Sequence, residues 1–364
     1  MVQRRAVLAG LCAAGLAPAQ SWADAGDPAY LSAAMRPDGT AVLCGLNRLG
    51  ARLFARPLPA RGHAAAAHPT RPEAVAFARR PGTFALVVNC LDGTTKTRLA
   101  LPRGHHFYGH GAFSGDGDLL FTTENAIETA RGMIGVWDTR RGYRRVGAFS
   151  SGGIGPHDIQ CLPDGQTLAV ANGGIETHPE TGRLKLNIPT MRPNLSYVAP
   201  DGGILEQVTL DAAYRKNSLR HLAIAGDGAV AFALQWQGDP GTHPPLLGFH
   251  RQGGRVRLAA AAPDTVRRLS GYVGSLAVSD VENAVAITSP RGGVVQIFGL
   301  ADGGFRRQAA LPDVCGVAGG PGGFLVTNGL GQTVQNPTAA RAHVVEHAVQ
   351  WDNHLVALRG RRAA

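Results

Sequence analysis

Histidine is the residue of this sequence whose spacing points most directly to chemistry. The chain has 13 histidines in 364 residues, and some of them recur at the same point of a repeated motif, just before an apolar run, a glycine-containing turn and a second apolar run. These residues are His63, His110, His157 and His221. Neutral imidazole binds copper, iron, zinc and nickel, so imidazoles that converge would form a transition-metal site. The alternative is that each histidine makes a hydrogen bond between neighbouring repeats.

The repeated motif predicts the fold that must position these histidines. Seven segments share it, and successive segments start about thirty to just over sixty residues apart, close to the length of a four-stranded propeller blade. The segments start at Leu31, Gly62, Gly109, Pro156, Arg220, Gly274 and Val314. The 49 glycines, 23 prolines and a charged fraction of 17% favour many short strands over a helical bundle. We therefore expect an all-β, seven-bladed β-propeller that forms one domain over residues 26–360. A pair of β-sandwiches would not account for the recurrence.

Propeller topology predicts where the histidines lie. The first strand of each blade is nearest the axis, so residues that open this strand should stand around one mouth of the central channel. In the remaining three segments the aligned residues are Ser275, Cys315 and Ser32. The Cys315 thiol would join the histidines as a metal ligand and favour softer ions. His354, in the closing segment WDNHLVAL, either reaches the same face or packs within the last blade. We expect the ring to close by pairing of residues 29–35 with strands of residues 344–358.

A second set of polar residues is expected on the same face, where the second strands end. These residues should orient the histidines or hold a substrate. The candidates are Glu124, Asn125, Asn172, Gln235, Gln237 and Asn328, with Glu176 in the longest loop. For Asn172, turn chemistry is the favoured alternative, because asparagine tolerates a left-handed backbone.

The first 25 residues read as an export signal. Arg4 and Arg5 precede a short segment rich in alanine and glycine, and Ala23 to Ala25 offer a small-residue cleavage site. The apolar segment is shorter than the roughly 20 residues of a transmembrane span. We therefore expect export by the twin-arginine route to the periplasm, no stable membrane insertion and a monomer. The cysteines left after cleavage form no CxxC pair, so their disulfide state stays open; they are Cys44, Cys90, Cys161 and Cys315.

Several function classes find little support. The formal net charge is +10, but the arginines are scattered through turns without a basic helix or an aromatic platform, which argues against nucleic-acid binding. The sequence has no G-x-S-x-G elbow, no H-E-x-x-H, no Walker loop and no GxGxxG that leads into a helix. We therefore expect no nucleotide cofactor, and the catalytic residues of any enzyme activity are unknown.

Several long segments together resemble a known family. They are HPTRPEAVAFARRPGTFALV (68–87), GHHFYGHGAFSGDGDLLFTTEN (104–125), RGMIGVWD (131–138), GIGPHDIQCLPDGQTLAVANGGIETHPETGR (153–183) and WDNHLVAL (351–358). In this order they resemble a bacterial family of Tat-exported propellers that is known only as a domain of unknown function. The resemblance implies a periplasmic seven-bladed propeller. It also implies genomic neighbours that encode imelysin-type proteins and a dihaem oxidoreductase-like protein, which suggests partner proteins and a role in iron acquisition. The family has no established catalytic residues to carry over.

The leading hypothesis is a periplasmic propeller that binds iron or copper through the histidine ring and assists metal uptake, with redox chemistry as an extension. One alternative is a non-catalytic platform that docks partner proteins on the same rim, through loop residues such as Arg183 and Lys185. Another is an enzyme that acts on a small organic substrate such as a lactone or a quinone. Propellers host such chemistry, although a fold by itself does not imply a function.

Overall fold

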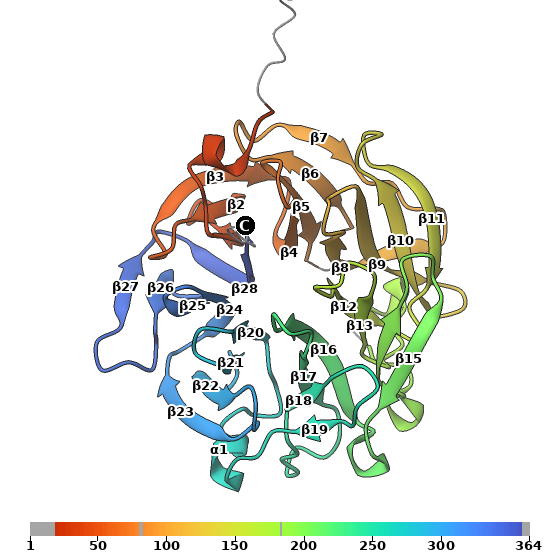
Figure 1. The fold of residues 1–364 in the computed structure, drawn as a ribbon, viewed down its shortest axis with the longest axis vertical. Helices are drawn as coiled ribbons and strands as arrows, with labels where there is room; N and C mark the ends of the chain where they lie inside the picture. The colour runs from red at the N-terminus through yellow and green to blue at the C-terminus, as the bar shows by residue number, and fades with distance from the viewer. Residues whose placement is uncertain (1–18, 80–82, 183, 359–364) are drawn as a thin grey trace, which may run out of the picture.

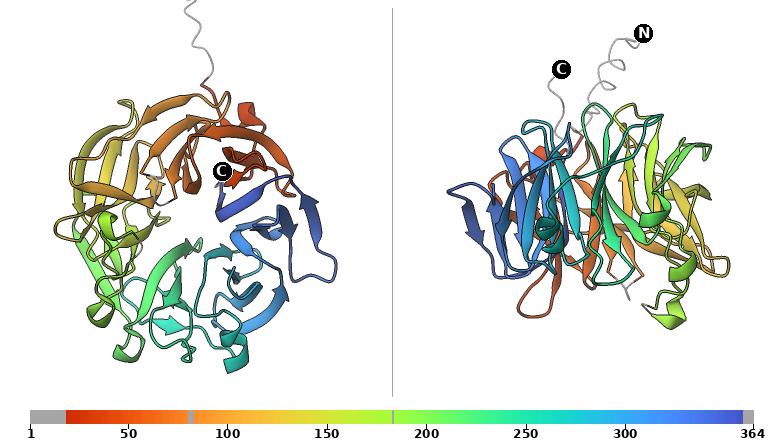
Figure 2. Two further views of the ribbon diagram at one scale, coloured as in Figure 1. Left: turned by 180° about the vertical axis from the view of Figure 1, so that it is seen from behind. Right: turned by 90° about the horizontal axis from the view of Figure 1, so that it is seen from below.

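The computed structural model describes residues 19–79, 83–182 and 184–358. Its strands form seven four-stranded antiparallel sheets, which stand around a central axis as the blades of a propeller (Figure 1). Seen from the side, the blades form a disc, and the described chain begins and ends on the same face (Figure 2). The all-β, seven-bladed, single-domain fold expected from the sequence is confirmed.

We number the blades 1 to 7 around the ring and give their strands from the axis outward. Blade 1 consists of β28 (Gln350–Ala357), β1 (Tyr30–Met35), β2 (Ala41–Leu46) and β3 (Arg52–Leu58). Blade 2 consists of β4 (Gly62–Ala67), β5 (Glu73–Ala78), β6 (Ala85–Asn89) and β7 (Thr95–Arg98), and blade 3 of β8 (His105–Phe113), β9 (Leu119–Ala126), β10 (Arg131–Asp138) and β11 (Arg144–Ser150). Blade 4 consists of β12 (Pro156–Cys161), β13 (Leu168–Asn172), β14 (Asn194–Val198) and β15 (Ile204–Thr209).

The remaining blades follow the same order. Blade 5 consists of β16 (Asn217–Ile224), β17 (Val230–Trp236), β18 (Leu247–His250) and β19 (Arg257–Leu258), and blade 6 of β20 (Ser275–Ser279), β21 (Ala284–Ser289), β22 (Val294–Gly299) and β23 (Phe305–Ala310). Blade 7 consists of β24 (Val314–Gly320), β25 (Gly323–Asn328), β26 (Gln332–Gln335) and β27 (His343–Glu346). Short helices are η1 (Trp22–Ala25), η2 (Pro179–Thr181), η3 (Ile188–Thr190), η4 (Ala212–Tyr214) and α1 (Pro263–Arg267). None of the helices in the described ranges is long and apolar enough to cross a membrane.

The ring closes through blade 1, where the last strand of the chain pairs with the first. Strand β28 runs antiparallel to β1, with Tyr30 opposite Ala357 and Met35 opposite Gln350, as the sequence predicted. One expectation was wrong, however: β1 is the second strand of its blade, so Ser32 does not occupy the inner-strand position. That strand is β28, which comes from the C-terminus, and the Ser32 hydroxyl donates a hydrogen bond to the carbonyl oxygen of His354 at 2.9 Å. A run of apolar residues does not distinguish the first strand of a blade from the second. For this reason the alignment took β1 as the first strand of its blade.

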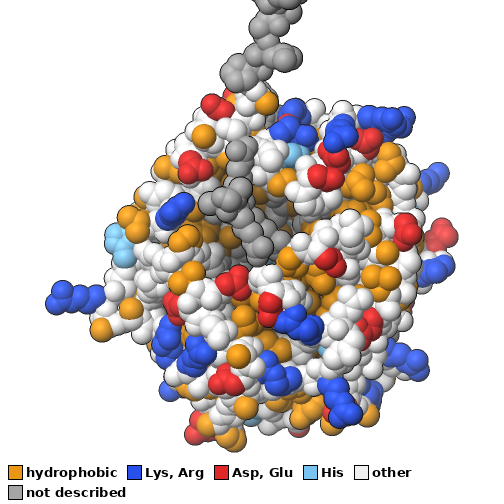
Figure 3. Space-filling model, in the orientation of Figure 1, with side chains coloured by type: hydrophobic (Ala, Val, Ile, Leu, Met, Phe, Trp, Pro, Cys, Tyr) orange, Lys and Arg blue, Asp and Glu red, His pale blue; other side chains and the backbone are white. Residues whose placement is uncertain are grey.

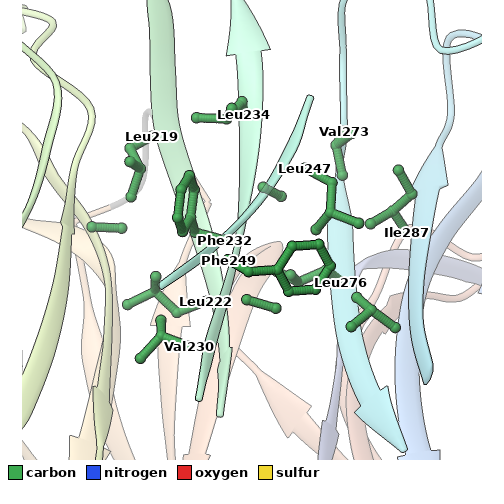
Figure 4. Packing of buried hydrophobic residues seen from close by; sticks show 14 of the residues in the cluster. Leu219, Leu222, Val230, Phe232, Leu234, Leu247, Phe249, Val273, Leu276 and Ile287 are labelled. Carbon is green, nitrogen blue, oxygen red and sulfur yellow. The ribbon is translucent and has the colours of Figure 1, made fainter. Parts of the chain in front are cut away.

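Apolar side chains fill the spaces between neighbouring blades and hold the inner strands in place. The second strands β13 and β21 are buried along their whole length, whereas the outer strand β7 is mostly exposed. Between blades 5 and 6, Phe232 packs in one cluster with Leu222 and Leu276 (Figure 4). Truncation of a buried phenylalanine to alanine costs about 3–5 kcal/mol, so such clusters make each blade a rigid support for its neighbour.

The two faces of the disc are built differently. Tight turns with glycine in the left-handed region connect the inner strand to the second strand in blades 3, 4 and 5, at Gly117 (φ 80°), Gly165 (φ 67°) and Gly228 (φ 86°). We call the face on which the inner strands end, and which is seen in Figure 1, the turn face. The face on which the inner strands begin carries the long connection between β13 and β14, and we call it the loop face.

Most of the predicted export signal lies outside the described residues. Its described part, around η1, packs against the propeller. Trp22 is only 9% exposed, and its indole Nε1 donates a hydrogen bond to the carbonyl oxygen of His68 at 2.8 Å. Cleavage after residue 25 remains a prediction, and it would remove this contact.

Candidate metal centre

Five imidazoles from five consecutive blades meet on the propeller axis. The predicted residues His63, His110, His157 and His221 come from β4, β8, β12 and β16, and His354 joins them from β28. Between neighbouring blades the ring centroids are 4.7 Å apart for His354 and His63, 5.0 Å for His63 and His110, 5.0 Å for His110 and His157, and 4.7 Å for His157 and His221. The structure therefore brings together the four aligned histidines. It also shows that His354, which sequence reasoning left undecided, belongs to the same cluster.

A β-bulge accompanies each of these histidines in its inner strand. The pairing register shifts beside each histidine. The shifts lie between Gly62 and Ala65 in β4, Phe107 and Gly111 in β8, Pro156 and Asp158 in β12, and Leu219 and His221 in β16. In the pairing of β28 with β1, the shift lies between Ser32 and Ala34 of β1. A bulge inserts extra residues into one strand and re-aims the side chain at that point. In blade 6, where the pairing of β20 with β21 is regular, the strand opens with Ser275 instead. The bulges therefore accompany the turn of the imidazoles toward the axis.

Gly109 makes room for this packing. Its φ of +101° lies in the region that side-chain-bearing residues rarely adopt, and a Cβ at this position would lie 2.7 Å from Cδ2 of His63. Only glycine allows the bulge of β8 and the His63 ring to approach so closely.

His110 lies at the centre of the cluster. Its Nε2 is 3.3 Å from Nε2 of His63, and its ring centroid is 4.8 Å from that of His354 and 5.8 Å from that of His221. On the opposite side of the ring, Nδ1 lies 3.4 Å from Oδ1 of Asp158. A carboxylate at Nδ1 favours the tautomer that leaves Nε2 as an electron-pair donor, an arrangement typical of metal-binding histidines.

Asp158 is held rigidly for this role. Its oxygens accept hydrogen bonds from the backbone N–H groups of Ile159 at 2.8 Å and Leu222 at 2.9 Å. Burial acts to raise the pKa of this carboxyl, but the neighbouring His110 and the hydrogen bonds outweigh it, so the pKa lies below its usual value. The side chain is therefore an anion at neutral pH, although it is only 5% exposed.

The cluster offers two overlapping sets of three ligand atoms. One set is His63, His110 and His157, and the other is His110, His221 and His354; within each set the ligand atoms lie within 4.8 Å of one another. Imidazole nitrogens bind ions such as zinc at about 2.0–2.1 Å, so two ligands of one ion lie at most about 4.2 Å apart. Ligand atoms at the wider end of the observed range would have to move closer together to share one ion. The second set is wholly buried, whereas His63 and His157 are partly exposed.

Three of the imidazoles, those of His157, His221 and His354, are held neutral, which is the form that binds metals. Burial, together with the neighbouring His110 and Arg220, lowers the pKa of His221 to about 3. The pKa values of His157 and His354 also lie well below the usual value, first because of burial and then because of the other imidazoles and a nearby arginine.

Several ring nitrogens have no hydrogen-bond partner within the described chain. They are Nδ1 of His157, Nδ1 of His221 and Nε2 of His354. Buried polar atoms are almost always paired, so unpaired ones call for a water or an ion. Hydrogen bonds between blades therefore do not account for the whole cluster.

Cys315, the predicted thiol ligand, stands at the equivalent point of blade 7 but faces away from the imidazoles. Its Sγ lies 3.5 Å from the carbonyl oxygen of Thr327 and 3.7 Å from that of Trp351. Burial raises the pKa of this thiol to about 12. The structure does not bring Cys315 into either set of three ligands found among the described residues.

The other predicted binding residues make local contacts within the blades. Glu124 is fully buried and accepts two hydrogen bonds from Arg145, at 2.6 and 2.8 Å. Asn172 is bonded to Ser151 and Asn194. The side-chain amide of Gln235 donates to the carbonyl oxygen of Val273 at 3.0 Å.

Glu176 lies in the long connection on the loop face. There its backbone N–H donates to Oδ1 of Asn187 at 2.8 Å. The structure does not gather Glu124, Asn172, Gln235 and Glu176 into one site with the histidines.

Comparison with known proteins supports the fold and identifies the family. Hydrazine synthase from Kuenenia stuttgartiensis is similar in structure, with a TM-score of 0.59 and 14% sequence identity over 89% of this chain and 96% of that chain. At this identity the likeness shows the fold alone. A search of curated proteins finds no match. A family model described as "Protein of unknown function (DUF1513)" matches residues 56–358, and with a match over most of its length the chain belongs to the DUF1513 family.

Proposed function

We propose that this protein binds one transition-metal ion, iron or copper, at the histidine cluster and serves metal acquisition in the periplasm. The observation that carries the proposal is the convergence of five imidazoles, with His110 at their centre and a fixed carboxylate on its far side. Neutral, buried and partly unpaired ring nitrogens are costly unless something binds them.

The donor set selects the class of metal. All the ligand atoms of both sets are imidazole nitrogens, which suit copper, iron, nickel and zinc, whereas magnesium and calcium prefer oxygen. Because the thiol of Cys315 points elsewhere, the site has no special preference for soft ions such as Cu(I). Among divalent ions in vitro, affinity should follow the usual order, with Cu²⁺ the tightest.

Sharing of His110 limits the cluster to one ion at a time. With its Nδ1 beside Asp158, this imidazole has only Nε2 to offer, so the two sets compete for it. An ion would then occupy either the partly exposed set or the buried set. Two alternative positions in one cluster suit a protein that takes up an ion and passes it on. The export signal read from the sequence and the genomic neighbours implied by the family resemblance support a periplasmic role in iron uptake.

Metal analysis of the purified, folded protein tests the proposal. The wild type should carry iron or copper, or bind added Cu²⁺ and Fe²⁺ at one ion per chain. Replacement His110→Ala removes a ligand from both sets and should weaken Cu²⁺ binding by roughly two orders of magnitude. His157→Ala and His354→Ala each leave one set intact and should have smaller effects.

His343→Ala provides a matched control, because His343 is exposed on the outer strand β27. This variant should bind metal as the wild type does. Wild-type protein that carries no metal and ignores both added ions would refute the proposal, as would a His110→Ala variant with unchanged affinity.

A further inference from the structure

The central channel contains a largely apolar cavity between the histidine cluster and the turn face. Its volume is about 780 Å³, within the range of about 300–1,000 Å³ that is typical of small-molecule sites. After the residue that faces the axis at its start, most inner strands continue toward the turn face with small or apolar residues. Examples are Ala64–Ala67 of β4 and Leu276–Val278 of β20. Hydrophobic side chains are visible on the turn face toward the middle of the disc (Figure 3).

Within the described part of the chain, several residues of the apolar wall are left partly exposed. Although they lie at the middle of the molecule, Ala65, Ala67, Ala223, Val278 and Val356 are all partly exposed, and all of them line the cavity. Apolar surface that faces an open cavity is favourable to bury, at about 25 cal/mol per Å².

The histidines form the inner end of this cavity. Its lining includes His110, His221 and His354, the members of the buried ligand set, together with Asp158. A molecule in the cavity would therefore present one end to the imidazoles or to an ion bound by them.

The charge of the lining selects a neutral ligand. The protein carries a formal net charge of +10, yet no lysine or arginine is among the described residues that line the cavity. Among the described lining residues an anion would find no lysine or arginine and would meet the Asp158 carboxylate, while an organic cation would lose its hydration beside the apolar wall. Desolvation thus disfavours charged molecules of either sign.

We infer that the cavity binds a small neutral organic molecule with an apolar body and one electron-pair donor atom, and that the donor atom reaches the histidine cluster. The apolar body is bound by the alanine-rich wall, and the donor atom contacts either an ion held by the buried set His110, His221 and His354 or, without an ion, a ring N–H of one of these imidazoles. The part of the inference that involves an ion rests on the proposed function. Occupation of the cavity does not require a bound ion.

Calorimetry with two probes of the same shape tests the inference. The neutral probe is para-phenylpyridine, and the anionic probe is para-phenylbenzoate. The wild-type protein should bind para-phenylpyridine about tenfold or more tightly than para-phenylbenzoate. Replacement Ala223→Phe fills the cavity and should weaken binding of the neutral probe by about tenfold or more. The matched control is Ala148→Phe, on the exposed outer strand β11, which should bind the probe as the wild type does.

A second measurement needs no substitution in the cavity wall. Cys161 also lines the cavity and is partly exposed, while Cys44, Cys90 and Cys315 are buried. Neutral benzyl methanethiosulfonate should modify Cys161 faster than anionic sulfonatoethyl methanethiosulfonate does, and para-phenylpyridine should slow this reaction. Mass spectrometry of the modified peptide reads out both rates.

Metal content measured on the same samples separates the two proposals. If Ala223→Phe loses binding of the neutral probe while its metal content is unchanged, the inference is supported. If protein that takes up no metal still binds the probe, only the proposed function is contradicted. The inference is overturned if wild-type protein does not bind para-phenylpyridine, if it prefers para-phenylbenzoate, or if the probe neither depends on Ala223 nor protects Cys161.

Discussion

The two ends of the central channel differ in chemistry, although the same inner strands build both. At the loop face, charged groups border the cluster. The buried carboxylate of Asp352, two residues before His354, is paired with Arg61 at 2.7 Å and Arg79 at 2.8 Å. At the turn face, the channel is lined mainly by small and apolar side chains, with no described lysine or arginine. The histidine cluster lies between fixed charge on one side and, on the other, a largely apolar cavity whose described lining has no lysine or arginine.

This contrast explains why His221 and His354 stay neutral. Burial beside the apolar cavity lowers the pKa values of His221 and His354, and positive charge at the loop end, from Arg220 and Arg79, lowers them further. Each end thus contributes to keeping the nitrogen lone pairs available. The loop end acts through charge, and the turn end acts through removal of water.

The largest expected effect is the acid sensitivity that follows from burying neutral imidazoles. In the unfolded chain these histidines take up protons below about pH 6.5, whereas folded His221 does so only near pH 3. The unfolded state therefore binds more protons between these values, and stability is lost as the pH falls from 6.5 toward 3. The loss should reach about 1.4 kcal/mol per pH unit for each such histidine.

Urea unfolding of the metal-free protein at several pH values measures this slope. The variant His221→Gln should show a shallower slope than the wild type, and His343→Ala should show the same slope as the wild type. A stability that is flat between pH 6.5 and 4 would contradict the burial of neutral imidazoles at the inner end of the cavity.

The carboxylate behind the central histidine provides the next test. Asp158→Asn keeps the shape of the side chain but removes the charge that orients His110, so Cu²⁺ affinity should fall about 10–100-fold. Asp201→Asn, in an exposed turn, should leave the affinity unchanged. Equal affinities for Asp158→Asn and the wild type, measured by competition with a chelator, would remove Asp158 from the site.

Gly109 tests whether the bulge of β8 positions the cluster. A Cβ at this residue would strike the His63 ring, and the positive φ by itself costs about 1–2 kcal/mol for other residues. Gly109→Ala should lower both the free energy of unfolding and the metal affinity. The control Gly147→Ala, where a Cβ meets nothing within 4 Å, should lower neither. A stable Gly109→Ala variant with wild-type metal binding would show that His63 is dispensable.

The smallest effect is expected from placing a positive charge in the wall of the cavity. Val278→Lys introduces an ammonium group into the wall of the apolar cavity, and the preference for neutral over anionic probes should fall by about tenfold. Val344→Lys, at a residue 47% exposed on β27, should not change it. An unaltered preference in Val278→Lys would mean that the absence of charge in the cavity does not select the ligand.

Particular residues show how far the sequence could lead. The repeated motif predicted the number of blades, and the histidines that recur in four of its copies predicted the meeting of His63, His110, His157 and His221. The sequence did not identify the inner strand of blade 1, because that strand comes from the C-terminus. Ser32 was therefore aligned with the position that His354 occupies. Nor could the sequence show that the Cys315 thiol turns toward Thr327, because a residue at a bulge faces a direction that strand alternation does not predict.

The sequence by itself determined the repeat, and with it the fold, since a strand period and its turns are local properties of the chain. It also determined which residue types stand at the inner strands. Only the tertiary structure decided how the imidazoles are shared around His110, which side chains turn away, and that a largely apolar cavity adjoins them. These features arise where seven strands that are distant in the sequence meet on one axis, and no local pattern records the distances between them.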